Sequence, residues 1–102
     1  MDALVRIKRA ILRGDYVFTK KAREEMVVDG LRELDVVEAV LNAVAIYKTV
    51  RSRSPIRKGV REKLYIIQST NLSGLPIYTK GKLVSDRGVD TYYLLISSKR
   101  AM

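Results

Sequence analysis

The hydrophobic period of this chain changes near residue 44, and this change constrains the fold more than any other feature. Before it, apolar residues recur at the three- and four-residue spacing of amphipathic helices. After it, β-branched and aromatic residues gather in short runs separated by turn-prone residues, as in strands. The pattern predicts one α+β domain over residues 1–102, with N-terminal helices packed on one face of a twisted, mainly antiparallel sheet.

Three helices are expected in the first part of the chain. Asp2 is placed to cap the first helix and Gly14 to end it. Thr19 is placed to cap a second helix over residues 20–28. A third helix is expected from about residue 33 to residue 43.

The third helix has an apolar stripe for the core and acidic residues near its start, as the helix dipole favours. Val36 and Val40 fall on the stripe, and Asp35 and Glu38 are expected on the solvent side.

Four strands are expected in the second part of the chain, over residues 45–50, 63–68, 77–84 and 91–97. Loops this short favour antiparallel neighbours. If the helices cover one face of the sheet, the other face stays free for a ligand.

The charge of the chain divides at the same place as its hydrophobic period. Residues 1–43 hold eight Lys/Arg and eight Asp/Glu, whereas residues 44–102 hold twelve Lys/Arg and three acids, which gives the whole net charge of +9. Such a field favours a polyanion, because phosphates neutralised by the protein release condensed counterions. The expected partner of the sheet is therefore a nucleic acid.

Composition excludes several classes of site. The chain has no Cys and no His, which excludes disulfides, thiolate zinc sites, cysteine nucleophiles and the usual general base. There is no glycine-rich phosphate loop and no acid cluster spaced for a divalent metal, so we expect neither a cofactor nor a metal. Charges interrupt the apolar residues of the N-terminus, so we expect a cytoplasmic protein without a signal peptide or a membrane partner.

Three stretches of the chain resemble a known family. These are FTKKAREEMVVDGLRELDVVEAVLNA, the IYKTVRS that follows it, and the terminal YYLLISSKRA. Together they resemble the MqsR-type mRNA interferases, which are toxins of type II toxin-antitoxin systems with a RelE-like fold, over roughly residues 5–100. The resemblance implies metal-free cleavage of single-stranded mRNA, on or off the ribosome. It also implies a cognate antitoxin, in related systems of a zinc-ribbon plus helix-turn-helix type.

The resemblance also implies catalytic residues. The family lysine after the helices matches Lys48, its strand tyrosine resembles Tyr78, and its last-strand lysine matches Lys99. Counting back from Tyr65 places Glu62 where the family has glutamine. This is a chemical departure, because a carboxylate can act as a base but also puts a negative charge near the phosphate.

Phosphate contacts are expected from cations that follow the helices, because arginine is suited to bidentate phosphate binding. These cations are Arg51, Arg53, Arg57, Lys58, Arg61 and Lys80. Of Tyr65, Tyr92 and Tyr93, which are candidates for stacking on bases, at least two are expected in the core.

Other interpretations of the same residues stay open. A lysine on the solvent face of a sheet needs no function, and a charged loop is usually just solvated. The alternatives to an endoribonuclease are a non-catalytic RNA-binding or regulatory module on the same basic face, and an inactive toxin.

Overall fold

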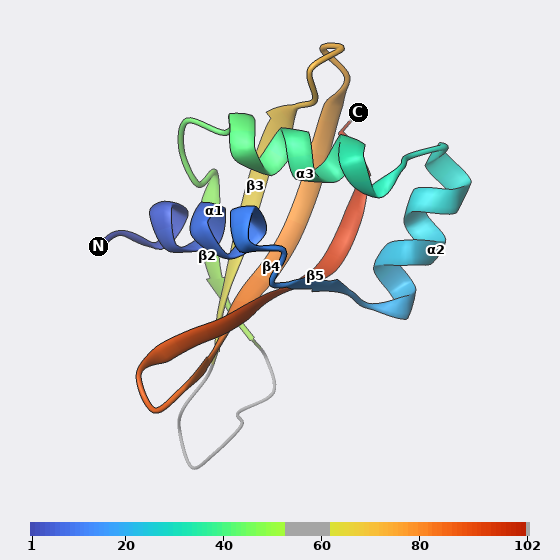
Figure 1. The fold of residues 1–102 in the computed structure, drawn as a ribbon. Coiled ribbons are helices and arrows are strands. Elements are labelled where there is room, and N and C mark those ends of the chain that lie inside the picture. Colours follow the sequence, from blue (N-terminus) through green and yellow to red (C-terminus); the bar gives the residue numbers. More distant parts are fainter. Residues whose placement is uncertain (53–61, 102) are drawn as a thin grey trace.

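The structure is a computed structural model that describes residues 1–52 and 62–101. Its elements in chain order are α1 (Ala3–Arg13), β1 (Tyr16–Phe18), α2 (Lys20–Asp29), α3 (Glu33–Asn42), β2 (Lys48–Arg51), β3 (Lys63–Thr70), β4 (Pro76–Asp86) and β5 (Val89–Arg100). The expected α+β class is confirmed, because the three N-terminal helices pack against a mixed sheet of five strands in this part of the chain (Figure 1).

The first two helices begin at the expected residues; the first ends before Gly14 as expected, and the second ends at Asp29, one residue beyond the expected end. The Asp2 carboxylate accepts a hydrogen bond from the Val5 N–H at 2.9 Å, and the Thr19 hydroxyl accepts one from the Ala22 N–H at 3.1 Å. Gly14 ends α1 with a φ of 80°, a conformation that favours glycine. Across residues 1–52 and 62–101, no helix combines the length and the apolar character that crossing a membrane would require.

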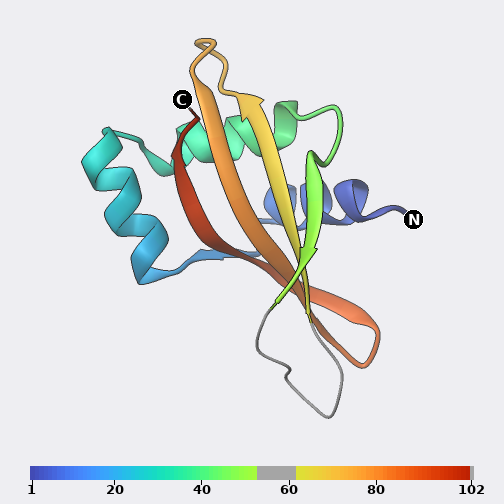
Figure 2. The ribbon, with the colours of Figure 1, turned by 180° about the vertical axis from the view of Figure 1, so that it is seen from behind.

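The strand order in the sheet is β1-β5-β4-β3-β2, seen from the side away from the helices in Figure 2. Strands β2 to β5 form the expected antiparallel succession. Strand β1 was not expected in the sheet. It pairs in parallel with β5, with Tyr16 opposite Tyr93. A three-residue segment is too short for its own sequence to reveal a pairing with residues so far along the chain.

The core lies between the helices and one face of the sheet. Ile7, Val36, Ile67 and Leu95 are among its fully buried side chains. Tyr65 and Tyr93 are buried there as well, which confirms that at least two of the three candidate stacking tyrosines serve the core. These two tyrosines are therefore unavailable to bases.

Asp35 does not lie on the solvent side of α3, as the helical pattern predicted. The residue is only 7% exposed, and its carboxylate accepts hydrogen bonds from the Arg32 guanidinium at 3.1 Å and from the Asn71 amide at 3.1 Å. The bonds from Arg32 contribute most to lowering the pKa of Asp35 to about 2. The prediction was wrong because Asn71, in the turn between β3 and β4, lies against the Asp35 carboxylate and donates a hydrogen bond to it.

Candidate active site

One face of the sheet is left open by the helices (Figure 2). The side chains that point into the core are Ile67 of β3 and Ile77 and Thr79 of β4. Because successive side chains of a strand point to opposite faces, the residues that alternate with these lie on the other side of the sheet. We call this side the open face. Its residues are Lys48 and Val50 of β2, Leu64, Ile66 and Gln68 of β3, Tyr78, Lys80, Lys82 and Val84 of β4, and Tyr92, Leu94 and Lys99 of β5.

Tyr78 and Lys99, two of the candidate catalytic residues, are brought together on the open face. They lie directly opposite each other on β4 and β5. The Lys99 Nζ atom lies 5.3 Å from the centroid of the Tyr78 ring. A cation over an aromatic face is attracted to the ring electrons, so each side chain restricts the other.

Gln68 completes a row with this pair, and sequence reasoning missed it. It lies on β3 directly opposite Tyr78. The row Gln68–Tyr78–Lys99 crosses three adjacent strands, which spans about 10 Å between its outer members. An amide, a phenol and an ammonium group therefore stand side by side on an exposed surface.

The turn that follows Gln68 could have identified it, from the sequence alone, as the residue opposite Tyr78. Residues 71–75 connect β3 to β4 with Ser73 in the middle, and Gln68 and Tyr78 are each five residues from Ser73. Residues equally distant from the middle of a hairpin turn face each other across it. Counting from the turn would have selected Gln68, whereas counting along the strand from Tyr65 selected Glu62.

Lys48 lies in the next row of the open face. The register places Lys48 opposite Ile66, and Ile66 opposite Lys80. This row is two residues along the strands from the Gln68–Tyr78–Lys99 row, which is about 7 Å. The Cα atoms of Lys48 and Tyr78 are then about 12 Å apart, so their two side chains can reach one nucleotide step from different sides.

Glu62 does not join these rows. It lies just before β3 and precedes Gln68 by six residues, a separation of about 20 Å in an extended chain. Its Oε1 atom accepts a hydrogen bond from Lys82 Nζ at 2.8 Å, and both side chains are half-buried. Glu62 therefore neutralises a lysine at the far end of the open face.

The six predicted phosphate-binding residues divide into three groups. Lys80 lies on the open face. Arg51 is exposed. In the register it lies opposite Lys63, and the alternation of side chains along β2 places it on the side of the sheet that the helices cover. Arg53, Arg57, Lys58 and Arg61 lie outside the described residues.

Cations dominate the chemistry of the open face. Within residues 1–52 and 62–101, no group of three or more acidic side chains is placed to hold a metal ion. The groups that converge instead are Lys48, Gln68, Tyr78, Lys80 and Lys99. Such groups can bind an anion, stabilise added negative charge on it and exchange a proton with it.

Comparisons of the chain with models of protein families, with curated proteins and with solved structures found no match. The resemblance to MqsR-type interferases therefore stays a hypothesis.

Proposed function

We propose that this protein is a metal-independent endoribonuclease of the cytoplasm, which cleaves single-stranded mRNA as the toxin of a type II toxin-antitoxin system. One observation carries the proposal: Gln68, Tyr78 and Lys99 form a row on an exposed face, with Lys48 and Lys80 in the row beside it. These groups come from four adjacent strands, and their long side chains can reach the phosphates of an RNA strand that crosses the open face.

The proposed reaction is a transesterification. The 2′ oxygen of a ribose attacks the adjacent phosphorus, and the bond from phosphorus to the 5′ oxygen of the next nucleotide breaks. The 2′ hydroxyl loses its proton and the departing 5′ oxygen gains one, which leaves a 2′,3′-cyclic phosphate and a free 5′ hydroxyl. The reaction needs a proton acceptor, a proton donor and positive charge near the phosphorane.

Four of the five polar groups of the two rows have roles that their chemistry supports. Lys80 and Lys99 hold the negative charge that grows on the phosphate oxygens. The amide of Gln68 donates a hydrogen bond to the same oxygens and orients the phosphate. Tyr78 can both give and accept a proton, so we assign it the proton exchange with the reacting oxygens.

Substrate binding follows from the charge of the second half of the chain. The net charge of +9 and the lysines of the open face attract the RNA backbone before any specific contact forms. A partner antitoxin with an acidic segment would use the same field and compete with RNA. Binding of either partner should weaken as salt is added.

A defined single-stranded RNA incubated with the protein in EDTA tests the proposal. We expect cleavage with a cyclic phosphate product, and at least about tenfold slower cleavage by Lys99→Ala and by Tyr78→Phe. Lys63→Ala is the matched control, because Lys63 is an exposed strand lysine whose parity is that of the helix side. Repeating the assay with ribosome-bound mRNA shows whether the ribosome is needed.

One observation favours a second candidate, a non-catalytic RNA-binding module. Glu62 is held by Lys82 away from the two rows, so in the described structure neither row contains a carboxylate, and the chain has no histidine. An RNA that binds tightly and stays intact in the same assay would establish this second function. Cleavage lost equally in Lys63→Ala and Lys99→Ala would also count against a dedicated active site.

A further inference from the structure

The C-terminal part of β5 lies at an edge of the sheet, and a helix lies beside this edge in the place of a further strand. Strand β1 pairs only with Tyr93, Leu94 and Leu95 of β5. Beyond Leu95, the outer edge of β5 has no neighbouring strand among the described residues. Helix α2 lies beside this edge, and not over the face of the sheet (Figures 1 and 2).

Polar groups of α2 bind the exposed backbone of this edge. The Glu25 carboxylate, through Oε1, accepts a hydrogen bond from Ser97 Oγ at 2.7 Å and another from the Ser98 N–H at 3.1 Å. One helical turn later, the Asp29 carboxylate accepts a hydrogen bond from the Arg100 N–H at 2.8 Å. The Arg100 side chain in turn donates to the Asp29 carbonyl at 3.1 Å.

The two elements match in their repeat distances. Residues four apart on a helix rise by about 6 Å along its axis. Backbone N–H groups on one edge of a strand are two residues apart, which is about 6.7 Å. Glu25 and Asp29 can therefore serve Ser98 and Arg100 in the way that the carbonyls of a neighbouring strand would.

Helix α2 depends on these contacts because it buries little apolar surface. Only Ala22 and Met26 of the helix are buried, whereas Val27 and Val28 are 79% and 84% exposed. The Glu25 side chain is only 21% exposed, so its two bonds to β5 are shielded from water. Burial alone would raise the pKa of Glu25, but the hydrogen bonds from Ser97, Lys21 and Ser98 outweigh it and lower the pKa.

Lys99 stands between the two residues that α2 holds. Its backbone pairs with Tyr78 of β4 on one side, while Ser98 and Arg100 are bound by α2 on the other. The end of an edge strand normally frays, since half of its backbone groups lack protein partners. We propose that Glu25 and Asp29 are positioning residues that fix Lys99 over Tyr78, an inference that rests on the proposed function for its catalytic consequence.

Glu25→Ala and Glu24→Ala form the pair of variants that tests this inference. Both remove one negative charge from α2, and both residues line the hollow between α2 and Lys99. Glu24 is exposed, however, and within the described residues it accepts no hydrogen bond from β5, unlike Glu25. We expect about a tenfold loss of kcat in Glu25→Ala relative to Glu24→Ala, with KM changed less than about twofold between them. Glu25→Gln keeps an acceptor oxygen and should restore most of the kcat.

Nuclear magnetic resonance gives a readout that does not depend on activity. The Tyr78 ring should shift the side-chain protons of Lys99 upfield, because the ammonium group lies over the ring. This shift should be lost in Glu25→Ala and kept in Glu24→Ala. If the wild-type protein does not cleave RNA, the proposed function fails, and the Lys99 resonances alone decide whether Glu25 positions this side chain.

Equal kcat values and equal Lys99 shifts in Glu25→Ala and Glu24→Ala would overturn the inference. Should Glu25→Ala fail to fold, Ser97→Ala and Asp29→Ala each remove one contact of the same edge. Both must then move the Lys99 resonances toward their values in an unstructured peptide. Unmoved resonances in both variants would overturn the inference as well.

Discussion

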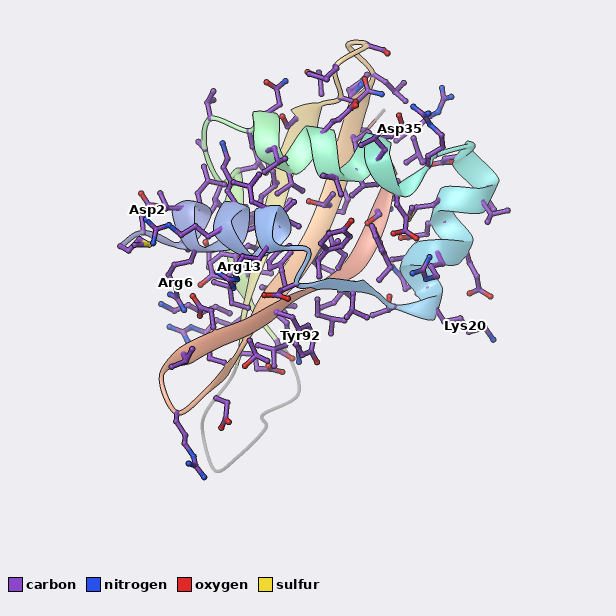
Figure 3. The ribbon with its side chains drawn as sticks, viewed as in Figure 1. Asp2, Arg6, Arg13, Lys20, Asp35 and Tyr92 are labelled. Carbon is purple, nitrogen blue, oxygen red and sulfur yellow. The ribbon has the colours of Figure 1, made fainter. Side chains whose placement is uncertain are left out.

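Arg6 of α1 forms a bidentate ion pair with Asp90 of β5, although 84 positions separate them in the chain. The Arg6 Nε atom donates to Asp90 Oδ2 at 2.9 Å, and its Nη2 atom donates to Oδ1 at 2.7 Å. Figure 3 shows Arg6 reaching from α1 toward the hairpin of β4 and β5. The pair joins the first helix to the strand that carries Lys99 at its other end.

This ion pair predicts a loss of stability in acid. The hydrogen bonds from Arg6 contribute most to lowering the pKa of Asp90 to about 2. Because the pKa is lower in the folded state, the stabilisation is present above about pH 4 and is lost as the pH falls toward about 2. We expect Asp90→Asn to lower the free energy of unfolding by about 1 kcal/mol at pH 7. Urea unfolding should show that this difference disappears near pH 2; a constant difference would contradict the assignment.

Asn71 is expected to set the geometry of the β3–β4 turn. Its side chain is buried, accepts hydrogen bonds from the N–H groups of Ser73 and Leu75, and donates one to Asp35. Asn71→Ala leaves these groups without partners, so we expect a loss of about 2 to 3 kcal/mol in urea unfolding. Leu72→Ala is the control in the same turn, because Leu72 is exposed. Equal stability of the two variants would show that the Asn71 bonds do not hold the turn.

Tyr93→Phe is a substitution that is expected not to destabilise the protein, unlike the two variants above. Its ring is fully buried, and its hydroxyl finds no hydrogen-bond partner in the described residues. Removing a buried hydroxyl without a partner costs no bond, so Tyr93→Phe should keep the stability or raise it by up to about 1 kcal/mol. Thermal unfolding measures the change. A clear loss of stability would mean that this hydroxyl is bonded in solution.

Gly81 is predicted to be required for stability, because it lies against the ring of Tyr93. A Cβ atom at Gly81 would lie 2.5 Å from Cζ of Tyr93 and 2.7 Å from the carbonyl oxygen of Leu94. Neither a buried ring nor a paired backbone can move away easily, so Gly81→Ala should cost about 3 kcal/mol or more in urea unfolding. Lys80→Ala on the same strand is the control, because the Lys80 side chain forms no hydrogen bond or ion pair within the described residues, whereas Lys82 is paired with Glu62. A Gly81→Ala protein as stable as that control would show that the sheet can adjust.

Local chemistry was sufficient to predict much of this fold. Asp2, Gly14 and Thr19 act through bonds or backbone angles within one helical turn, so the sequence around each of them specifies the helix end. The strands follow from their β-branched and aromatic runs. A face left free by the helices followed from the same reasoning. Tyr78 and Lys99 were named from the resemblance alone, and the register places them opposite each other.

Tertiary contacts decided what could not be predicted. Strand β1 belongs to the sheet only because β5 returns to it from the far end of the chain. Asp35 is buried against Asn71, which lies 36 positions away in the chain. The spacing of residues within one helix cannot predict such a contact. Gln68 was not among the predicted site residues, because spacing along one strand does not reveal the register between two strands that places it opposite Tyr78.

The choice between Gln68 and Glu62 is itself open to experiment. Gln68→Ala should slow RNA cleavage by about tenfold or more, because it removes a hydrogen-bond donor from the row that holds the phosphate. Its stability should change little, since Gln68 is exposed. Glu62→Gln should leave kcat within about twofold, and it should tighten RNA binding because Lys82 is released to meet a phosphate. Single-turnover cleavage and salt-dependent binding separate the two effects. The reverse result, with Glu62→Gln inactive and Gln68→Ala active, would move the active site to the far end of the open face.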